Sequence, residues 1–136
     1  MLGAAGILLL GFVLCVWTPA RFAIELGATL PSIGMRGPLA VLELLAHGGI
    51  AAASAAAGWA LWTGRPPARP LARFALMASA AQTVQALYWS VLPQQTPPGS
   101  ELPLASLALA HAALWLIFLS RSARVRALAG EPERVT

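Results

Sequence analysis

The chain has 136 residues, of which 58% are hydrophobic and only 10% are charged, and its formal net charge at pH 7 is +4. This hydrophobic content exceeds what the core of a soluble domain of this size needs, which favours a membrane protein. All nine basic residues are Arg, and most of them flank apolar runs instead of forming a basic face interleaved with aromatic residues. The composition therefore argues against nucleic-acid binding.

The first apolar run, Leu2–Thr18, predicts a membrane span at the short end of the usual length range. Thr18 followed by Pro19 is typical of an N-cap and the first position of a new helix, so we predict a separate short helix there. Its mixed apolar and polar sides place it in the plane of the membrane interface. On its polar side, we expect Arg21 and Glu25 to pair because they lie four residues apart.

Three further apolar runs predict three more spans. The longest of them is free of Lys, Arg, Asp, Gln and Asn, and at about 1.5 Å per helical residue it can cross a hydrocarbon core of roughly 30 Å. It also carries small residues at every fourth position, Gly48, Ala52 and Ala56, which allow close contact with a neighbouring helix. The predicted spans after the first are 39–62, 71–92 and 104–120.

The distribution of Arg residues predicts the orientation of the spans. Seven of the nine Arg residues lie either in the connection after the second span or at the C-terminus. The positive-inside rule therefore places both termini in the cytoplasm. The predicted fold is all-α, an integral membrane four-helix bundle, with a single domain at residues 1–126 and a short cytoplasmic tail at residues 127–136.

Two ionisable residues, Glu43 and His47, lie within the second predicted span. Because such groups are costly to expose to lipid, they should face other helices or trapped water, and their spacing places them on one helix face. His111 lies at a similar depth in the fourth span, and the third span carries a polar stripe that should face the bundle interior. We therefore predict an intramembrane polar cluster of Glu43, His47, His111, Ser79, Gln82 and Thr83.

Three interpretations of this cluster are open. Glu43 and His47 could exchange protons in a substrate-linked role, or His47 and His111 could hold a haem iron between two helices. The group could also only fix the register of the helices. The chain has no Asp, no phosphate-binding loop with a Lys and no His-Glu-x-x-His motif, so we expect no enzymatic activity, no metal site and no cofactor.

The end of the fourth span carries a recognisable motif at residues 115–125. The motif reads Trp, two residues, an aromatic residue, three residues, Ser, one residue and Arg-Val, which resembles the C-terminal signature of a bacterial four-span membrane family known as domain of unknown function 2569. Where that family usually has Pro and Tyr, this chain has Ile117 and Phe118. The resemblance implies a multi-pass protein of the bacterial inner membrane without an established reaction. Its motif positions here are Trp115, Phe118, Ser122, Arg124 and Val125.

The small-residue faces and short connections, with no catalytic constellation, lead us to expect an accessory or assembly subunit of a larger membrane complex. The alternatives are a small proton-coupled carrier that uses Glu43 and His47, or a haem-binding subunit. The expected partners are the lipid bilayer and other membrane protein subunits. Near the C-terminus, Arg121, Arg124 and Arg126 are predicted to contact anionic lipid headgroups or an acidic partner surface.

Overall fold

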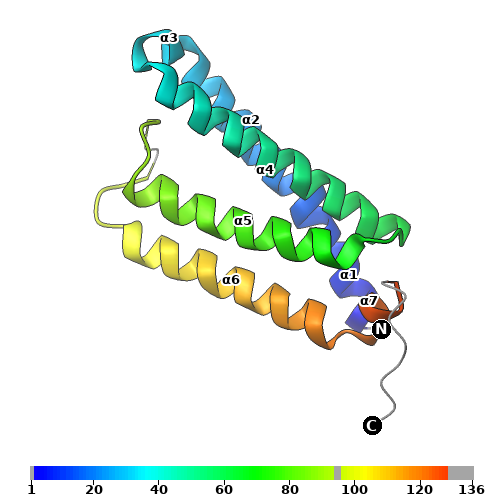
Figure 1. The fold of residues 1–136 in the computed structure, drawn as a ribbon. Coiled ribbons are helices and arrows are strands. Elements are labelled where there is room, and N and C mark those ends of the chain that lie inside the picture. Colours follow the sequence, from blue (N-terminus) through cyan, green and yellow to red (C-terminus); the bar gives the residue numbers. More distant parts are fainter. Residues whose placement is uncertain (1, 94–95, 129–136) are drawn as a thin grey trace.

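A computed structural model of the chain describes residues 2–93 and 96–128. Within these residues the regular secondary structure is helical, so the predicted all-α fold class is confirmed for them (Figure 1). Residues 129–136 of the predicted tail lie outside the described residues. The elements are α1 (Leu2–Phe12), the π-helix η1 (Val13–Trp17), α2 (Thr18–Thr29), the 3-10 helix η2 (Leu30–Ser32), α3 (Ile33–Arg36), α4 (Pro38–Thr63), α5 (Ala68–Tyr88), α6 (Glu101–Arg121) and α7 (Ala123–Leu128).

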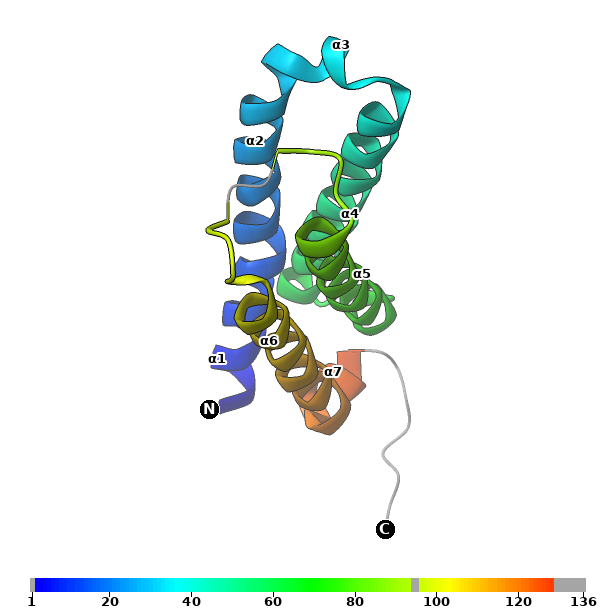
Figure 2. The same cartoon turned by 90° about the vertical axis from the view of Figure 1, so that its left-hand side faces the viewer.

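The first part of the chain forms one long helical rod. A continuous helical stretch of 34 residues, Gly3–Arg36, includes α1, η1 and α2, and Figures 1 and 2 show α2 following α1 along nearly the same axis. The separate interfacial helix predicted at Thr18 is therefore not confirmed. α2 does begin at Thr18, but it continues the preceding helix instead of turning into another direction.

The π-helix η1 explains why the rod is not broken at Pro19. Proline lacks a backbone N–H, and in a regular helix its ring presses on the carbonyl four residues earlier. In the turn before Pro19, the backbone N–H of Thr18 donates to the Val13 carbonyl five residues back. The Thr18 hydroxyl donates to the same carbonyl at 3.1 Å. This wider turn accommodates the proline with a local irregularity only.

α4 runs back along the rod after a tight turn. Gly37 occupies this turn with a φ of 81°, a left-handed value that favours glycine, and Pro38 then starts α4. Near its C-terminal end, α4 is in close contact with the long rod. A Cβ added to Gly58 would lie 2.7 Å from both the Cβ and the backbone nitrogen of Cys15. The Trp62 indole N–H donates to the Leu8 carbonyl at 3.3 Å.

α5 packs between α4 and α6, and α7 lies against α1, α5 and α6. The largest apolar core lies at the end of the molecule where α4 and α6 end, which we call the closed end. From there the pair formed by α2 and α4 diverges from the pair formed by α5 and α6 toward the opposite end, the open end (Figure 1). The buried members of this core are Ile7, Leu10, Leu14, Ala57, Ala60, Leu61, Ala68, Ala72, Ala75, Leu76, Trp115, Leu119 and Val125.

Among the described residues, three helical stretches are long and apolar enough to cross a membrane: Gly3–Arg36, Pro38–Thr63 and Glu101–Arg121. Many large apolar side chains on them are exposed, as expected for helices that face lipid. α5 is not among the three stretches, since its polar and Arg residues lower its hydropathy. Three spans are therefore supported, and the predicted fourth one is not confirmed.

Candidate functional site

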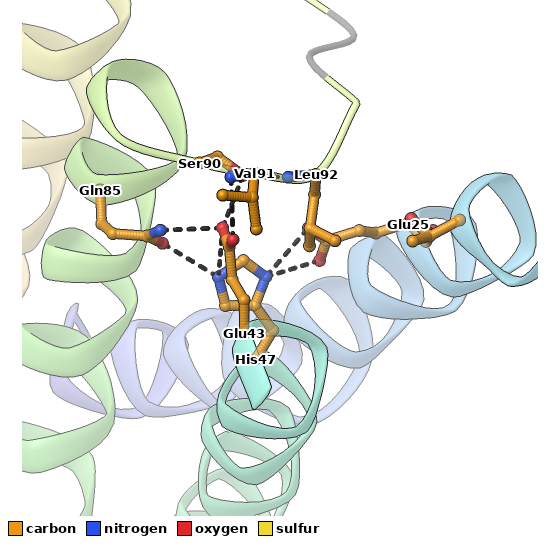
Figure 3. A network of polar contacts seen from close by, with 8 residues as sticks. Glu25, Glu43, His47, Gln85, Ser90, Val91 and Leu92 are labelled. Carbon is orange, nitrogen blue, oxygen red and sulfur yellow. Dashed lines mark hydrogen bonds and ion pairs between the residues drawn. The ribbon is translucent and has the colours of Figure 1, made fainter. Parts of the chain in front are cut away.

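His47 occupies the centre of a polar network near the open end of the molecule. Its side chain is 3% exposed, and it projects from α4 between α2 and α5 (Figure 3). The ring nitrogen Nδ1 lies 2.9 Å from Oε1 and 3.0 Å from Oε2 of Glu25 in α2. A carboxylate can only accept hydrogen bonds, so His47 donates from Nδ1. The pair joins α4 to the long rod.

Gln85 of α5 connects His47 to Glu43. Its Oε1 lies 3.2 Å from Nε2 of His47, and its Nε2 donates to Oε1 of Glu43 at 2.8 Å. Nε2 of His47 and Oε1 of Glu43 are 3.9 Å apart. When both carboxyl groups are ionised, the Gln85 oxygen must accept from His47, which then donates from both ring nitrogens. In this arrangement the imidazolium lies between two carboxylates.

Glu43 also holds the turn that follows α5. Its Oε1 accepts from the Ser90 hydroxyl at 2.5 Å, and its Oε2 accepts from the Val91 backbone N–H at 3.0 Å. The Ser90 hydroxyl oxygen in turn accepts from the Leu92 N–H at 3.0 Å. The Glu43 side chain is only 10% exposed, so these donors replace water around its charge. Figure 3 shows the network joining α2, α4, α5 and the following turn.

A cavity of about 750 Å³ lies beside this network. This volume is within the range of sites that bind drug-sized molecules. One wall comes from η1 and α2 with Trp17, Arg21 and Glu25, another from α5, and a third from α6 with His111. His47 reaches the cavity from α4. Glu25 and His47 therefore belong both to the charged network and to the cavity wall.

The predicted polar stripe of α5 lies on this cavity. Ser79, Gln82 and Thr83 all line it. The Thr83 hydroxyl donates to the Ser79 carbonyl at 2.9 Å, whereas the buried Ser79 hydroxyl has no hydrogen-bond partner among the described residues. A second cavity of about 650 Å³ lies between α4 and α5, and His47 and Gln82 line both. The network thus forms part of the wall between two cavities.

The arrangement does not suit the haem interpretation. Both ring nitrogens of His47 are engaged, one by Glu25 and the other by Gln85, so neither points freely at an iron. His111 is exposed, and its ring packs edge-on against Trp115 with 6.2 Å between ring centroids. Among the described residues, no group of three or more His, Cys, Asp and Glu side chains could hold a metal ion.

The residues of the C-terminal motif form the corner between α6 and α7 at the closed end. Trp115 is buried and meets Phe118 edge-on at 5.6 Å between ring centroids. Ser122 ends α6, and its hydroxyl oxygen accepts from the N–H of the fully buried Val125 at 3.4 Å. Arg124 is exposed, as are Arg121 and Arg126. The motif residues are therefore separate from the polar network.

The sequence reasoning missed two members of the network, Glu25 and Gln85. We expected Glu25 to pair with Arg21 on the surface of an interfacial helix, whereas it binds His47. Gln85 is not part of the predicted cluster, which takes only Ser79, Gln82 and Thr83 from this helix. A signal was present in both cases, since Glu25 is the only acidic residue of the first 40 and Gln85 is a second amide three residues after Gln82.

Comparisons of the chain with protein-family models, with curated proteins and with solved structures found no match. The resemblance to the domain of unknown function 2569 stays a prediction from the motif at residues 115–125. The fold and the site define the class instead: a protein whose described residues form helices, three of them apolar and of membrane-spanning length, with a charged network beside a cavity.

Proposed function

We propose that this chain is a small proton-coupled carrier that binds its solute in the cavity between α2, α5 and α6. The observation that carries the proposal is the position of Glu25, which binds His47 and also lines the cavity. A charged solute bound in the cavity lies beside Glu25 and changes the electrostatic balance of the Glu25–His47 pair. The solute and the proton on the His47 ring are then linked through one shared group.

The proposal includes four spans, with α5 as the third. The hydropathy of α5 is lowered by polar side chains that line the cavity or join the network, such as Gln82, Thr83 and Gln85. The exposed positions of the same helix include Phe74 and Met77, which suit contact with lipid. A helix with polar residues on one side and apolar residues on the other can cross the bilayer, because its polar groups face protein or a cavity.

The distribution of Arg residues supports an orientation with the closed end in the cytoplasm. The Arg residues near this end include Arg65 in the turn between α4 and α5 and the exposed Arg121, Arg124 and Arg126. The positive-inside rule assigns such connections to the cytoplasm. The cavity then faces the outer half of the membrane, while the apolar core closes the inner half. An outward-open form of a carrier has this arrangement.

Proton movement into proteoliposomes tests the proposal. The purified protein is reconstituted with a pH-sensitive dye inside, and organic anions, amines and amino acids are added outside in turn. The wild-type protein should move protons with at least one class of solute, and Glu43→Gln should abolish this movement. Glu101→Gln is the matched control, since Glu101 lies in the first turn of α6 and lines neither cavity.

The outcomes separate a carrier from a purely structural network. If folded Glu43→Gln protein, judged by circular dichroism and size-exclusion chromatography, still moves protons with solute, Glu43 only holds the helices together. If no solute class moves protons with the wild-type protein, the carrier proposal is wrong.

A second candidate function is the accessory or assembly subunit. The observation that favours it is a face of small, exposed residues on α4, Gly49, Ala52 and Ala56, and a Cβ added to Gly49 would touch nothing within 4 Å. Such a face suits a transmembrane helix of a partner membrane protein. Purification in a mild detergent should then recover a stoichiometric partner, and Ala52→Leu should release it. A lone monomer in a native membrane extract would exclude this function.

A further inference from the structure

Arg21 is a charged residue on the cavity wall that forms no ion pair with another described residue. It lies in α2 one turn before Glu25, is exposed, and lines the cavity. Within residues 2–93 and 96–128, the nearby carboxylates are engaged elsewhere: Glu25 by His47, and Glu43 by Gln85, Ser90 and Val91. No ion pair joins either of them to Arg21 in this part of the chain. Arg21 is therefore the charged group of the cavity wall that is open to a ligand.

Arg21 also lies at membrane depth in the proposed topology. The Trp62 indole contacts the rod at Leu8, and aromatic residues of this kind mark the membrane interface. Arg21 is about 20 Å further along the rod at 1.5 Å per residue, which is inside a hydrocarbon core of roughly 30 Å. An ionised Arg at this depth is costly unless water or an anion meets it.

The remainder of the cavity is suited to an apolar chain. Apart from His111, its walls near α2 and α6 are formed mostly by large apolar side chains, and its other polar groups are concentrated on α5 and around Glu25. A ligand with one charged head and one apolar tail therefore matches both parts. The apolar residues concerned include Leu14, Trp17, Ile24, Leu104 and Leu107.

We infer that the cavity binds an amphipathic anion, whose carboxylate or phosphate headgroup pairs with Arg21 while its apolar tail lies against Trp17 and the neighbouring apolar wall. Arg presents a planar fork of N–H donors that fits both oxyanions bidentately. A cationic headgroup is disfavoured, because both oxygens of Glu25 already accept from His47. The inference rests on the proposed function, as it names the class of solute for the same cavity.

Quenching of Trp17 fluorescence tests the inference. The protein is placed in nanodiscs of zwitterionic lipid, and probes with a dibrominated acyl chain are added, since bromine quenches a tryptophan that it contacts. The headgroups are a carboxylate, a phosphate, an alcohol and a quaternary ammonium. The carboxylate, the phosphate or both should quench in a saturable way, which also identifies the preferred oxyanion, and Trp17→Phe should remove the saturable part. Equal quenching by the alcohol or the ammonium probe would overturn the inference.

Substitutions of Arg21 give the second measurement. Arg21→Gln should raise the probe concentration at half-saturation about ten- to a hundredfold, the effect of losing a charge-assisted hydrogen-bonded pair. Arg21→Lys keeps the charge but loses the planar fork, so its half-saturation should lie between those of the wild-type protein and Arg21→Gln. Arg65→Gln, in the exposed turn at the closed end, should leave the half-saturation unchanged. An unchanged half-saturation in folded Arg21→Gln protein would overturn the inference.

The binding measurement is independent of proton coupling. Glu43 does not line this cavity, so Glu43→Gln should still bind the anionic probe. Anion binding without proton movement would contradict the carrier proposal and support the inference. Proton movement driven by another class of solute, with no quenching by either anionic probe, would overturn the inference and leave the carrier proposal standing.

Discussion

Replacing Glu43 with Gln should destabilise the protein by about 2–4 kcal/mol. Glu43 accepts hydrogen bonds from Gln85, Ser90 and Val91 at 2.5 to 3.0 Å. Bonds to a charged group contribute about 1.5–3 kcal/mol each, against about 0.5–1.5 kcal/mol for neutral pairs. The Gln carbonyl keeps two of the three bonds in weaker neutral form, and its NH2 group faces the Val91 N–H, which loses its acceptor. Water replaces part of that last bond, because Val91 is exposed.

The same substitution at Glu25 is the matched comparison. The Glu25 side chain is 27% exposed and binds only His47 within the described network, so solvent screening reduces its contribution to about 1 kcal/mol. The free energy of unfolding is measured by titrating SDS into mild-detergent micelles and following circular dichroism. A loss below about 1 kcal/mol for Glu43→Gln, or an equal loss for Glu25→Gln, would refute the assignment of three donors to a buried Glu43.

Three further results are expected. Gly58→Ala should cost about 1–3 kcal/mol in the same unfolding assay, because its Cβ would overlap the backbone of η1, whereas Gly49→Ala should be neutral or stabilising by up to about 1 kcal/mol. Ser90→Ala should cost about 1–2 kcal/mol and speed amide hydrogen exchange in the turn after α5, because the hydroxyl both donates to Glu43 and accepts from a backbone N–H. In a Cys15→Ala background, Cys at Ser100 should react with an impermeant maleimide added outside cells, and Cys at Arg65 should react only after permeabilisation. Reversed labelling would contradict the orientation.

The apolar runs of the sequence predicted the long helices because lipid-facing helices need no alternation of polar and apolar residues. The predicted 39–62 corresponds to α4, Pro38–Thr63. α5 and α6 begin three residues earlier than predicted, and each has a proline, Pro70 or Pro103, in its first turn. A proline in the first turn removes no hydrogen bond from the helix, since the first N–H groups of a helix have no partner within it.

The contacts between helices were harder to predict than the helices themselves. The i,i+4 rule paired Arg21 with Glu25, because it considers only neighbours on one helix. The buried His47 ring needs a hydrogen-bond partner more than the exposed Arg21 does, since no water can replace a missing acceptor at its ring nitrogens. Which acceptor binds His47 depends on how α2 crosses α4. The crossing in turn depends on the straight rod that continues through Thr18 and Pro19. The predicted break at Thr18 removed Glu25 from consideration.

The two ends of the molecule are held by different interactions, and this difference links the network to the cavity. Apolar residues gain little from leaving lipid for a helix interface, so close packing and hydrogen bonds provide much of the association. The closed end has close packing, as at Gly58 and Phe118, and a buried core. At the open end, the contacts of Glu25, His47 and Glu43 hold α2, α4 and α5 around the cavity. A substitution at Gly58 should therefore lower stability without changing probe binding, whereas a ligand bound beside Glu25 acts on the open end.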